Sequence, residues 1–206
     1  MRKNRLGSWS AIAVIVIGGM YVVTLGVGVA VHGLTTPIGD PILAIMEILT
    51  LLSALAVVLL MVAINDHASG PRKPYGLIAV AFTIVFAGTT SVVHFVELTA
   101  LRQLGTGGIV WPSPLYAAEL AAWDLFLGLA LLFAASVFEG GGLAGRARRG
   151  LLISGSLSLA GIIGPAVGDM RLQRVGILGY AVVFPLVCFT LARLFRVDSD
   201  EPPSPA

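Results

Sequence analysis

Residues 91–98 have the sequence Ser-Val-Val-His-Phe-Val-Glu-Leu and close an apolar run that extends from 75 to 98. About 20 apolar residues are enough to cross the hydrocarbon layer of a membrane as an α-helix. His94 and Glu97 are three positions apart, so a helix carries both on one face. Ionisable groups inside a membrane are costly unless they meet partners or water, and they indicate a functional site by default. The stretch therefore predicts a membrane-spanning helix with a polar site near one end.

The composition of the whole chain favours the same class of protein. Of its 206 residues, 57% are hydrophobic and only 12% are charged, which is not typical of a soluble domain. The net charge of +2 is too small to indicate nucleic-acid binding. The single cysteine, Cys188, excludes an internal disulfide and any multi-cysteine metal or redox site within one chain. We expect a multi-pass protein of the cell membrane with no nucleic-acid partner.

Six apolar runs are long enough to span the bilayer, at 9–31, 42–64, 75–98, 115–138, 151–168 and 175–195. They predict an all-α fold, a single six-helix transmembrane domain over residues 1–197. The first run follows basic residues, as a signal peptide does, but it is too long for one and is expected to stay uncleaved. The fifth run is rich in serine and glycine, which favours close packing against other helices. The polar, proline-rich tail at 198–206 cannot bury itself and is predicted to be disordered.

The basic residues predict the orientation, because lysine and arginine gather on the cytoplasmic side of membrane proteins. Six spans sort these residues very unevenly between the two sides. One side has Arg2, Lys3, Arg5, Arg72, Lys73, Arg146, Arg148, Arg149, Arg193 and Arg196, and the other has Arg102, Arg171 and Arg174. Both termini are therefore predicted to be cytoplasmic.

This orientation places the ionisable residues of the second and third spans in the outer half of the membrane. Glu47 lies about 10 Å below the outer end of the second span, at 1.5 Å per residue. His94 and Glu97 lie in the last outer turns of the third span.

The acids of the later spans follow the same rule. Glu119 is one to two turns into the fourth span and Asp124 about a turn deeper. Asp169 follows the fifth span on the outer side, either in an ion pair with the neighbouring arginines or over the mouth of a pocket. The exceptions, at inner ends, are Asp66 and Glu139. We expect the outer acids to converge on a single pocket.

Helical spacing indicates which side chains share a face. Tyr116, Glu119 and Trp123 fall at i, i+3 and i+7, which is one face. Asp124 is about 140° around the helix from Glu119, so one of the two acids is expected to serve a neighbouring helix. We expect the substrate to contact Asp124, Asp169, Tyr116, Trp123 and Tyr180.

A metal site is a further possibility, because histidines and carboxylates of the kinds that bind zinc or di-iron are present. No His-x-x-x-His or Glu-x-x-His spacing occurs, however. We therefore expect neither a metal nor a cofactor.

These features predict an acid–base enzyme that acts on a lipid-soluble substrate. One buried carboxyl can stay protonated as a general acid while another carboxylate, or an imidazole, accepts a proton. Glu47 and Glu119 are the candidates for acid and base, and His94 and Glu97 for a proton relay. Aromatic walls would stabilise a carbocation through their ring faces.

Two other classes fit the same residues. A non-catalytic lipid-binding or accessory protein needs nothing that the sequence lacks. A proton-coupled transporter needs groups that are reachable from both sides, and the apolar inner half of the spans disfavours it. The oligomeric state is left open.

The compact helical chain, with Glu47 in its second span and a late aspartate, Asp169, resembles the small integral-membrane terpene cyclases and, more distantly, the sterol isomerases. The resemblance covers the architecture and these two positions, and it implies cyclase or isomerase chemistry on an isoprenoid or another neutral lipid. Few basic residues are expected near the pocket and no aspartate-rich magnesium motif occurs, which disfavours ionisation of a diphosphate.

Overall fold

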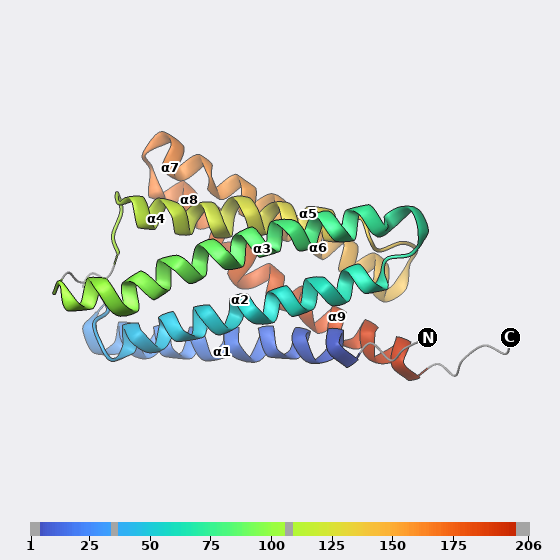
Figure 1. Cartoon of the computed structure of the whole chain (residues 1–206), viewed down its shortest axis with the longest axis horizontal. Coiled ribbons are helices and arrows are strands. Elements are labelled where there is room, and N and C mark those ends of the chain that lie inside the picture. The colour runs from blue at the N-terminus through green and yellow to red at the C-terminus, as the bar shows by residue number, and fades with distance from the viewer. Residues whose placement is uncertain (1–4, 34–36, 106–108, 201–206) are drawn as a thin grey trace, which may run out of the picture.

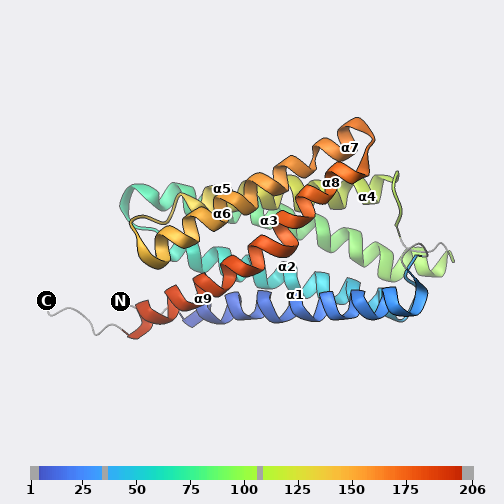
Figure 2. The ribbon, with the colours of Figure 1, turned by 180° about the vertical axis from the view of Figure 1, so that it is seen from behind.

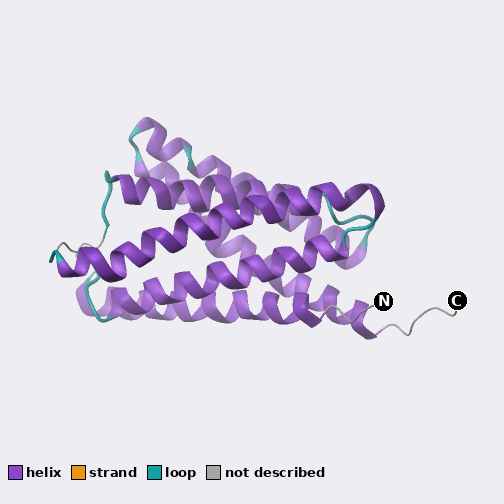
Figure 3. Cartoon of the chain, in the orientation of Figure 1, coloured by secondary structure: helices purple, strands orange, loops and turns teal. Residues whose placement is uncertain are grey.

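The computed structural model describes residues 5–33, 37–105 and 109–200, with side chains described as far as Val197. The described chain is helical and contains no strand (Figure 3). Its six long apolar helices are suited by length and composition to cross a membrane, which confirms the predicted all-α fold with six candidate spans. They extend over Arg5–His32, Ile42–His67, Gly70–Leu101, Pro114–Ala135, Gly142–Val167 and Met170–Val197.

The first two spans are single helices, α1 (Arg5–His32) and α2 (Ile42–His67), and the other four are composite. The third contains η1 (Gly70–Arg72), α3 (Lys73–Val96) and η2 (Glu97–Leu101). The fourth contains α4 (Pro114–Leu120), η3 (Ala121–Leu127) and α5 (Gly128–Ala135). The fifth contains α6 (Gly142–Gly161) and α7 (Ile163–Val167), and the sixth contains α8 (Met170–Ile177), η4 (Leu178–Val183) and α9 (Phe184–Asp200).

The ends of the six spans lie within about five residues of the predicted apolar runs, apart from the start of the fifth. The fifth helix begins at Gly142 rather than at residue 151, because arginines lower the hydropathy of a segment without preventing a helix. The last helix continues to Asp200, through the first three residues of the expected tail. Residues 201–206 of that tail lie outside the described residues.

Both ends of the described chain lie at the same end of the bundle (Figures 1 and 2). We call this the terminal end and the opposite one the distal end. The predicted division of basic residues holds for those that are described: only Arg102, Arg171 and Arg174 belong to the distal end. Arg2 and Lys3 lie outside the described residues.

The terminal half of the bundle has an apolar core. Leu60, Leu131, Leu151 and Phe195 are fully buried there. Many large apolar side chains instead point outward, as expected for surfaces that face lipid.

The fifth span packs closely against its neighbours, as its small residues predict. Ser154, Ser158 and Gly155 are buried, and the Ser154 hydroxyl donates a 2.9 Å hydrogen bond to the carbonyl of Gly179 in η4. A Cβ at Gly155 would meet the carbonyl oxygen of Gly128. Small side chains let the helix backbones approach, which is how membrane helices gain packing energy without a hydrophobic effect between them.

Three described segments, η2, η3 and η4, are π-helical. Their hydrogen bonds join residues five apart, and such wide turns are rare in proteins and frequent at functional sites. Each of these segments contains a residue of the predicted site: Glu97 begins η2, Trp123 and Asp124 lie in η3, and Tyr180 lies in η4.

Candidate functional site

Glu119 is the acceptor at the centre of a polar contact between α3 and the fourth span. The Thr90 hydroxyl lies 2.6 and 2.7 Å from its two carboxylate oxygens, and Nε2 of His94 lies 2.9 Å from Oε1. The indole N–H of Trp123 donates to the same Oε1 and also lies 3.0 Å from the Thr90 oxygen. Glu119 thus connects the fourth span to α3 through the side chains of Thr90 and His94.

His94 lies between two carboxyl groups. Its Nε2 faces Glu119 at 2.9 Å, and its Nδ1 lies 3.8 Å from Oε2 of Glu97. Nδ1 is buried and has no hydrogen-bond partner among the described residues. A small movement would therefore complete a carboxyl–imidazole–carboxyl chain, the arrangement in which an imidazole accepts a proton at one nitrogen and releases another at the second.

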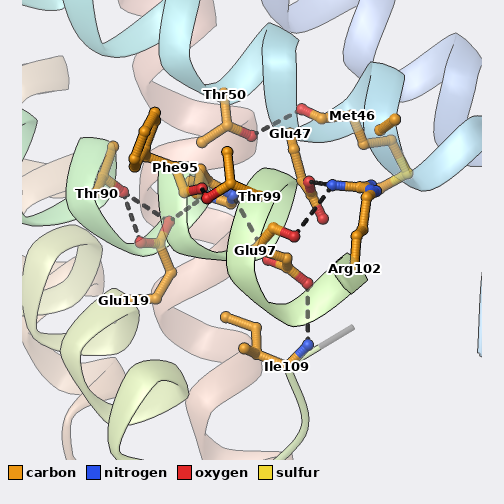
Figure 4. Close-up of polar contacts among 12 residues, drawn as sticks. Met46, Glu47, Thr50, Thr90, Phe95, Glu97, Thr99, Arg102, Ile109 and Glu119 are labelled. Atoms are coloured by element: carbon orange, nitrogen blue, oxygen red, sulfur yellow. Dashed lines mark hydrogen bonds and ion pairs between the residues drawn. The ribbon is translucent and has the colours of Figure 1, made fainter. Parts of the chain in front are cut away.

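The Glu97 carboxyl is held from its other side. It is only 5% exposed, and its Oε1 accepts a 2.9 Å hydrogen bond from the backbone N–H of Ile109 in the loop before α4 (Figure 4). The carboxyl of Glu47, in α2, is close enough to Glu97 to interact with it. One oxygen of Glu47 is buried and has no hydrogen-bond partner in the described part of the chain.

Arg102 joins this network to the distal surface. Its Nε and Nη2 donate 2.8 Å hydrogen bonds to both oxygens of Asp40, just before α2. Its Nη1 donates to Glu47 at 2.8 Å and to the carbonyl of Glu97 at 3.2 Å (Figure 4). One guanidinium thus connects an exposed aspartate with a glutamate that is 2% exposed. We call the chain from Asp40 through Arg102, Glu47, Glu97 and His94 to Glu119 the polar network.

Asp124 belongs to a second cluster. The Gln173 side chain in α8 donates a 3.3 Å hydrogen bond to its Oδ2 and lies 3.3 Å from the Tyr180 hydroxyl. Asp124 is fully buried, and its Oδ1 has no hydrogen-bond partner among the described residues. Glu119 thus serves α3 while Asp124 serves α8, in keeping with their separation around the helix.

A small pocket between the fourth and fifth spans includes Asp124 in its lining. Its volume is about 140 Å³, and its other lining residues are apolar. They are Ala117, Leu120, Ala121, Leu125, Ile162 and Pro165. Neither Glu47 nor Glu119 lines this pocket, so it is separate from the polar network.

Aromatic rings connect the two clusters. Trp123 lies 5.1 Å from the Tyr180 ring and contacts Phe86 edge to face at 4.8 Å, measured between ring centroids. Tyr21 of α1 is close enough to Glu119, Glu97 and Glu47 to interact with their charges. Tyr116 contacts Trp111 edge to face, with 6.2 Å between the ring centroids. Trp123, which donates to Glu119, therefore links the polar network to Tyr180 in the second cluster.

Asp169 lies apart from the polar network. It is exposed at the start of α8, where its side chain accepts a 2.9 Å hydrogen bond from the backbone N–H of Arg171. This N-cap contact, rather than an ion pair, holds the turn in the described structure. The expected single pocket thus includes Glu47, His94, Glu97 and Glu119 in one connected network, Asp124 in a neighbouring cluster, and Asp169 in neither.

Sequence reasoning did not place Arg102, Asp40 or Gln173 in the site. For Arg102 a signal was available, since it is one of the few basic residues of the distal end and lies five residues after Glu97 in the chain. The expectation of few basic residues near the pocket has this one exception, in the middle of the network. Gln173 gives no signal in the sequence, because its register in α8 depends on packing against Gly164.

The pairing with Arg102 has a measurable effect on Asp40, which lies outside the spans. Hydrogen bonding to the guanidinium holds the pKa of this carboxyl below its ordinary value. A lowered pKa in the folded state means that the link stabilises the fold at neutral pH and is lost as the pH falls through that pKa. The carboxylate is half exposed, so the energy involved is small. We expect the NMR titration of the Asp40 carboxyl to shift to higher pH in the Arg102→Gln variant, and an unshifted titration would contradict the pairing.

The described residues contain no group of three or more histidine, cysteine, aspartate or glutamate side chains placed to hold a metal ion. Taken together, the fold and the polar network define a multi-pass helical membrane protein with a buried acid–base network near one end of the bundle. No family model, curated protein or solved structure matches the chain.

Proposed function

We propose that the protein is an acid–base enzyme of the cell membrane that acts on a neutral isoprenoid or another lipid, as a cyclase or isomerase does. The observation that carries the proposal is the imidazole of His94 between the carboxyl groups of Glu97 and Glu119. Both termini are cytoplasmic in this proposal, because the terminal end has most of the basic residues. The network then lies in the outer half of the membrane.

The roles follow from the partners of each group. Glu119, which accepts from three donors, is the base. The carboxyls of Glu47 and Glu97 interact with each other, and we assign the acid to this pair. The rings of Trp123 and Tyr180 offer faces to a developing cation.

The proton balance closes within the network. Isomerisation of a double bond adds a proton to one carbon and removes another proton from a nearby carbon, with no net change. If the acid pair delivers the first proton and Glu119 takes the second, one proton must return from Glu119 to Glu97 through His94. The neutral ring first moves its own proton from Nε2 to Nδ1; Nε2 then takes the proton of Glu119 while Nδ1 releases its proton to Glu97, which restores the starting state. No metal or cofactor enters these steps.

A non-catalytic lipid-binding protein is the second candidate, and one observation favours it. Three side chains already donate to Glu119, as expected for a carboxylate whose role is to lock α3 against the fourth span. The buried carboxyl oxygen of Asp124 at the small pocket would then mark a binding site only.

The test compares the lipids of membranes that contain the wild type or the variants Glu47→Gln, Glu119→Gln and His94→Ala. We expect each variant to lower the rate of lipid conversion by about 10²–10⁴-fold, the usual contribution of general acid–base catalysis. Glu139→Gln, at the terminal end, is the control and is expected to keep full activity. Mass spectrometry of the lipid that co-purifies identifies the substrate.

If all three variants retain the lipid chemistry of the wild type, the enzyme proposal is wrong. A bound lipid that is chemically unaltered supports the binding protein instead. Proton flux in liposomes would support the third class, a proton-coupled transporter.

A further inference from the structure

A larger pocket lies at the terminal end, away from the polar network. Its volume is about 360 Å³, and it opens between the start of the third span, the end of α5 and the first turns of α6. It is lined by Pro71, Arg72, Tyr75, Ser136 and Arg148. The volume is within the usual range of sites for small molecules.

Two arginines make this pocket positively charged, and their side chains differ in their contacts. Arg72 forms an ion pair with Glu139 and donates a 3.1 Å hydrogen bond to the carbonyl of Ser136, so its guanidinium is fixed in place. Arg148 is exposed, and it has no hydrogen bond or ion pair with any described residue. The pocket therefore has one positioned cation and one whose donors remain available.

The surroundings add to the positive charge. Lys73, Arg146 and Arg149 are neighbours of the lining residues in the chain, and Glu139 is the one described acid in the α5–α6 connection. Guanidinium groups match the oxygens of a phosphate and bind them through paired hydrogen bonds. The charge and geometry of the pocket thus favour a phosphate group.

Tyr75 indicates where that phosphate comes from. Its side chain is 44% exposed and lies one turn into the third span, at the depth where a tyrosine places its ring among acyl chains and its hydroxyl among headgroups. Basic pockets between membrane helices on the cytoplasmic side are typical sites for anionic lipid headgroups.

We propose that this pocket binds the phosphate of an anionic phospholipid in the leaflet at the terminal end, through Arg148 and Arg72. The site is independent of the proposed lipid chemistry, because it lies at the opposite end of the bundle. It would fix a boundary lipid against α3 and α6.

The test uses a matched pair of variants of the purified full-length protein. Arg148→Gln removes a charge from the pocket, and Arg149→Gln removes the same charge from the next residue, which does not line it. Each protein is titrated with phosphatidylglycerol or phosphatidylcholine, and bound lipid is counted by native mass spectrometry while the melting temperature is recorded. Arg148 is exposed, so its replacement leaves the fold intact, and gel filtration checks this.

We expect phosphatidylglycerol, and not phosphatidylcholine, to be retained and to raise the melting temperature of the wild type and of Arg149→Gln. Arg148→Gln should bind it about tenfold more weakly, as loss of one charge-assisted contact predicts. Equal binding by the two variants would show that the arginines act through general charge alone and would overturn the proposal. Stabilisation by inorganic phosphate without any effect of phosphatidylglycerol would make the ligand a free anion, and the lipid assignment would be wrong.

Discussion

Arg102→Met is expected to destabilise the folded protein by on the order of 3 kcal/mol, because it leaves a buried carboxylate without its cation. Arg102 bonds to Asp40 before α2, to Glu47 within α2 and to the backbone at the end of α3. Of these partners, Glu47 is the one that water cannot reach, since it is 2% exposed. The Glu47 carboxylate must then either bind a proton or reach water through a movement of the helix.

The measurement is the unfolding free energy or the melting temperature in one detergent. A second change separates the loss of the pair from the loss of a side chain: in Arg102→Met/Glu47→Gln the stranded charge is gone, and stability should partly recover. Arg174→Met, also at the distal end and exposed, is the control and should change stability by less than about 0.5 kcal/mol. A double variant no more stable than Arg102→Met would show that Glu47 is not strained by the loss.

Gly176→Ala is expected to have an effect of similar size by overpacking. A Cβ at this position would overlap Oδ1 of Asp124 and come within 3.1 Å of the Cα of Gly161 in α6. Asp124 is held in place by Gln173, and the Gly161 contact is with backbone. The added Cβ can therefore be accommodated only if α8 moves away from η3 and α6. Overpacking of this kind costs about 1–3 kcal/mol and sometimes more.

The matched control is Gly88→Ala, in the middle of α3, where an added Cβ meets nothing within 4 Å. Removing the backbone freedom of a helical glycine there should be neutral or stabilise the fold by up to about 1 kcal/mol. The test compares the melting temperatures of Gly176→Ala and Gly88→Ala in one detergent. If Gly176→Ala melts at or above the temperature of the control, the close contact at Asp124 is not needed for the fold.

The sequence was sufficient for the architecture because the number of spans follows from a single physical quantity, the length of each apolar run. It was also sufficient to place Glu47, His94, Glu97 and Glu119 near the same end, since depth follows from span order and helical rise. It could not give their contacts. These contacts depend on how each span is rotated and on the angles at which the spans cross. The sequence pattern within one helix does not specify where the neighbouring helix lies.

Arg102 and Asp169 show what hydropathy and depth alone could not predict: Arg102 belongs to the polar network although it was not expected there, and Asp169 was expected there but lies outside it. Both are charged residues of the distal end, and hydropathy treats them alike. Arg102 enters the network because the η2 turn brings it back over the Glu97 carbonyl, whereas Asp169 caps α8 through a local backbone contact. The π-helical segments were not predicted either, because a regular α-helical period was expected along every span.

Two of those segments, η3 and η4, separate the distal and terminal portions of their spans. One residue corresponds to about 100° of rotation in an α-helix, so a widened turn changes the angular phase of everything beyond it. The directions in which side chains point on one side of η3 or η4 therefore do not follow the α-helical period of the residues on the other side. The apolar portion toward the terminal end anchors each of the two spans. The polar portion toward the distal end can accept different side chains without disturbing that anchor. Substrate specificity can therefore diverge at these two turns.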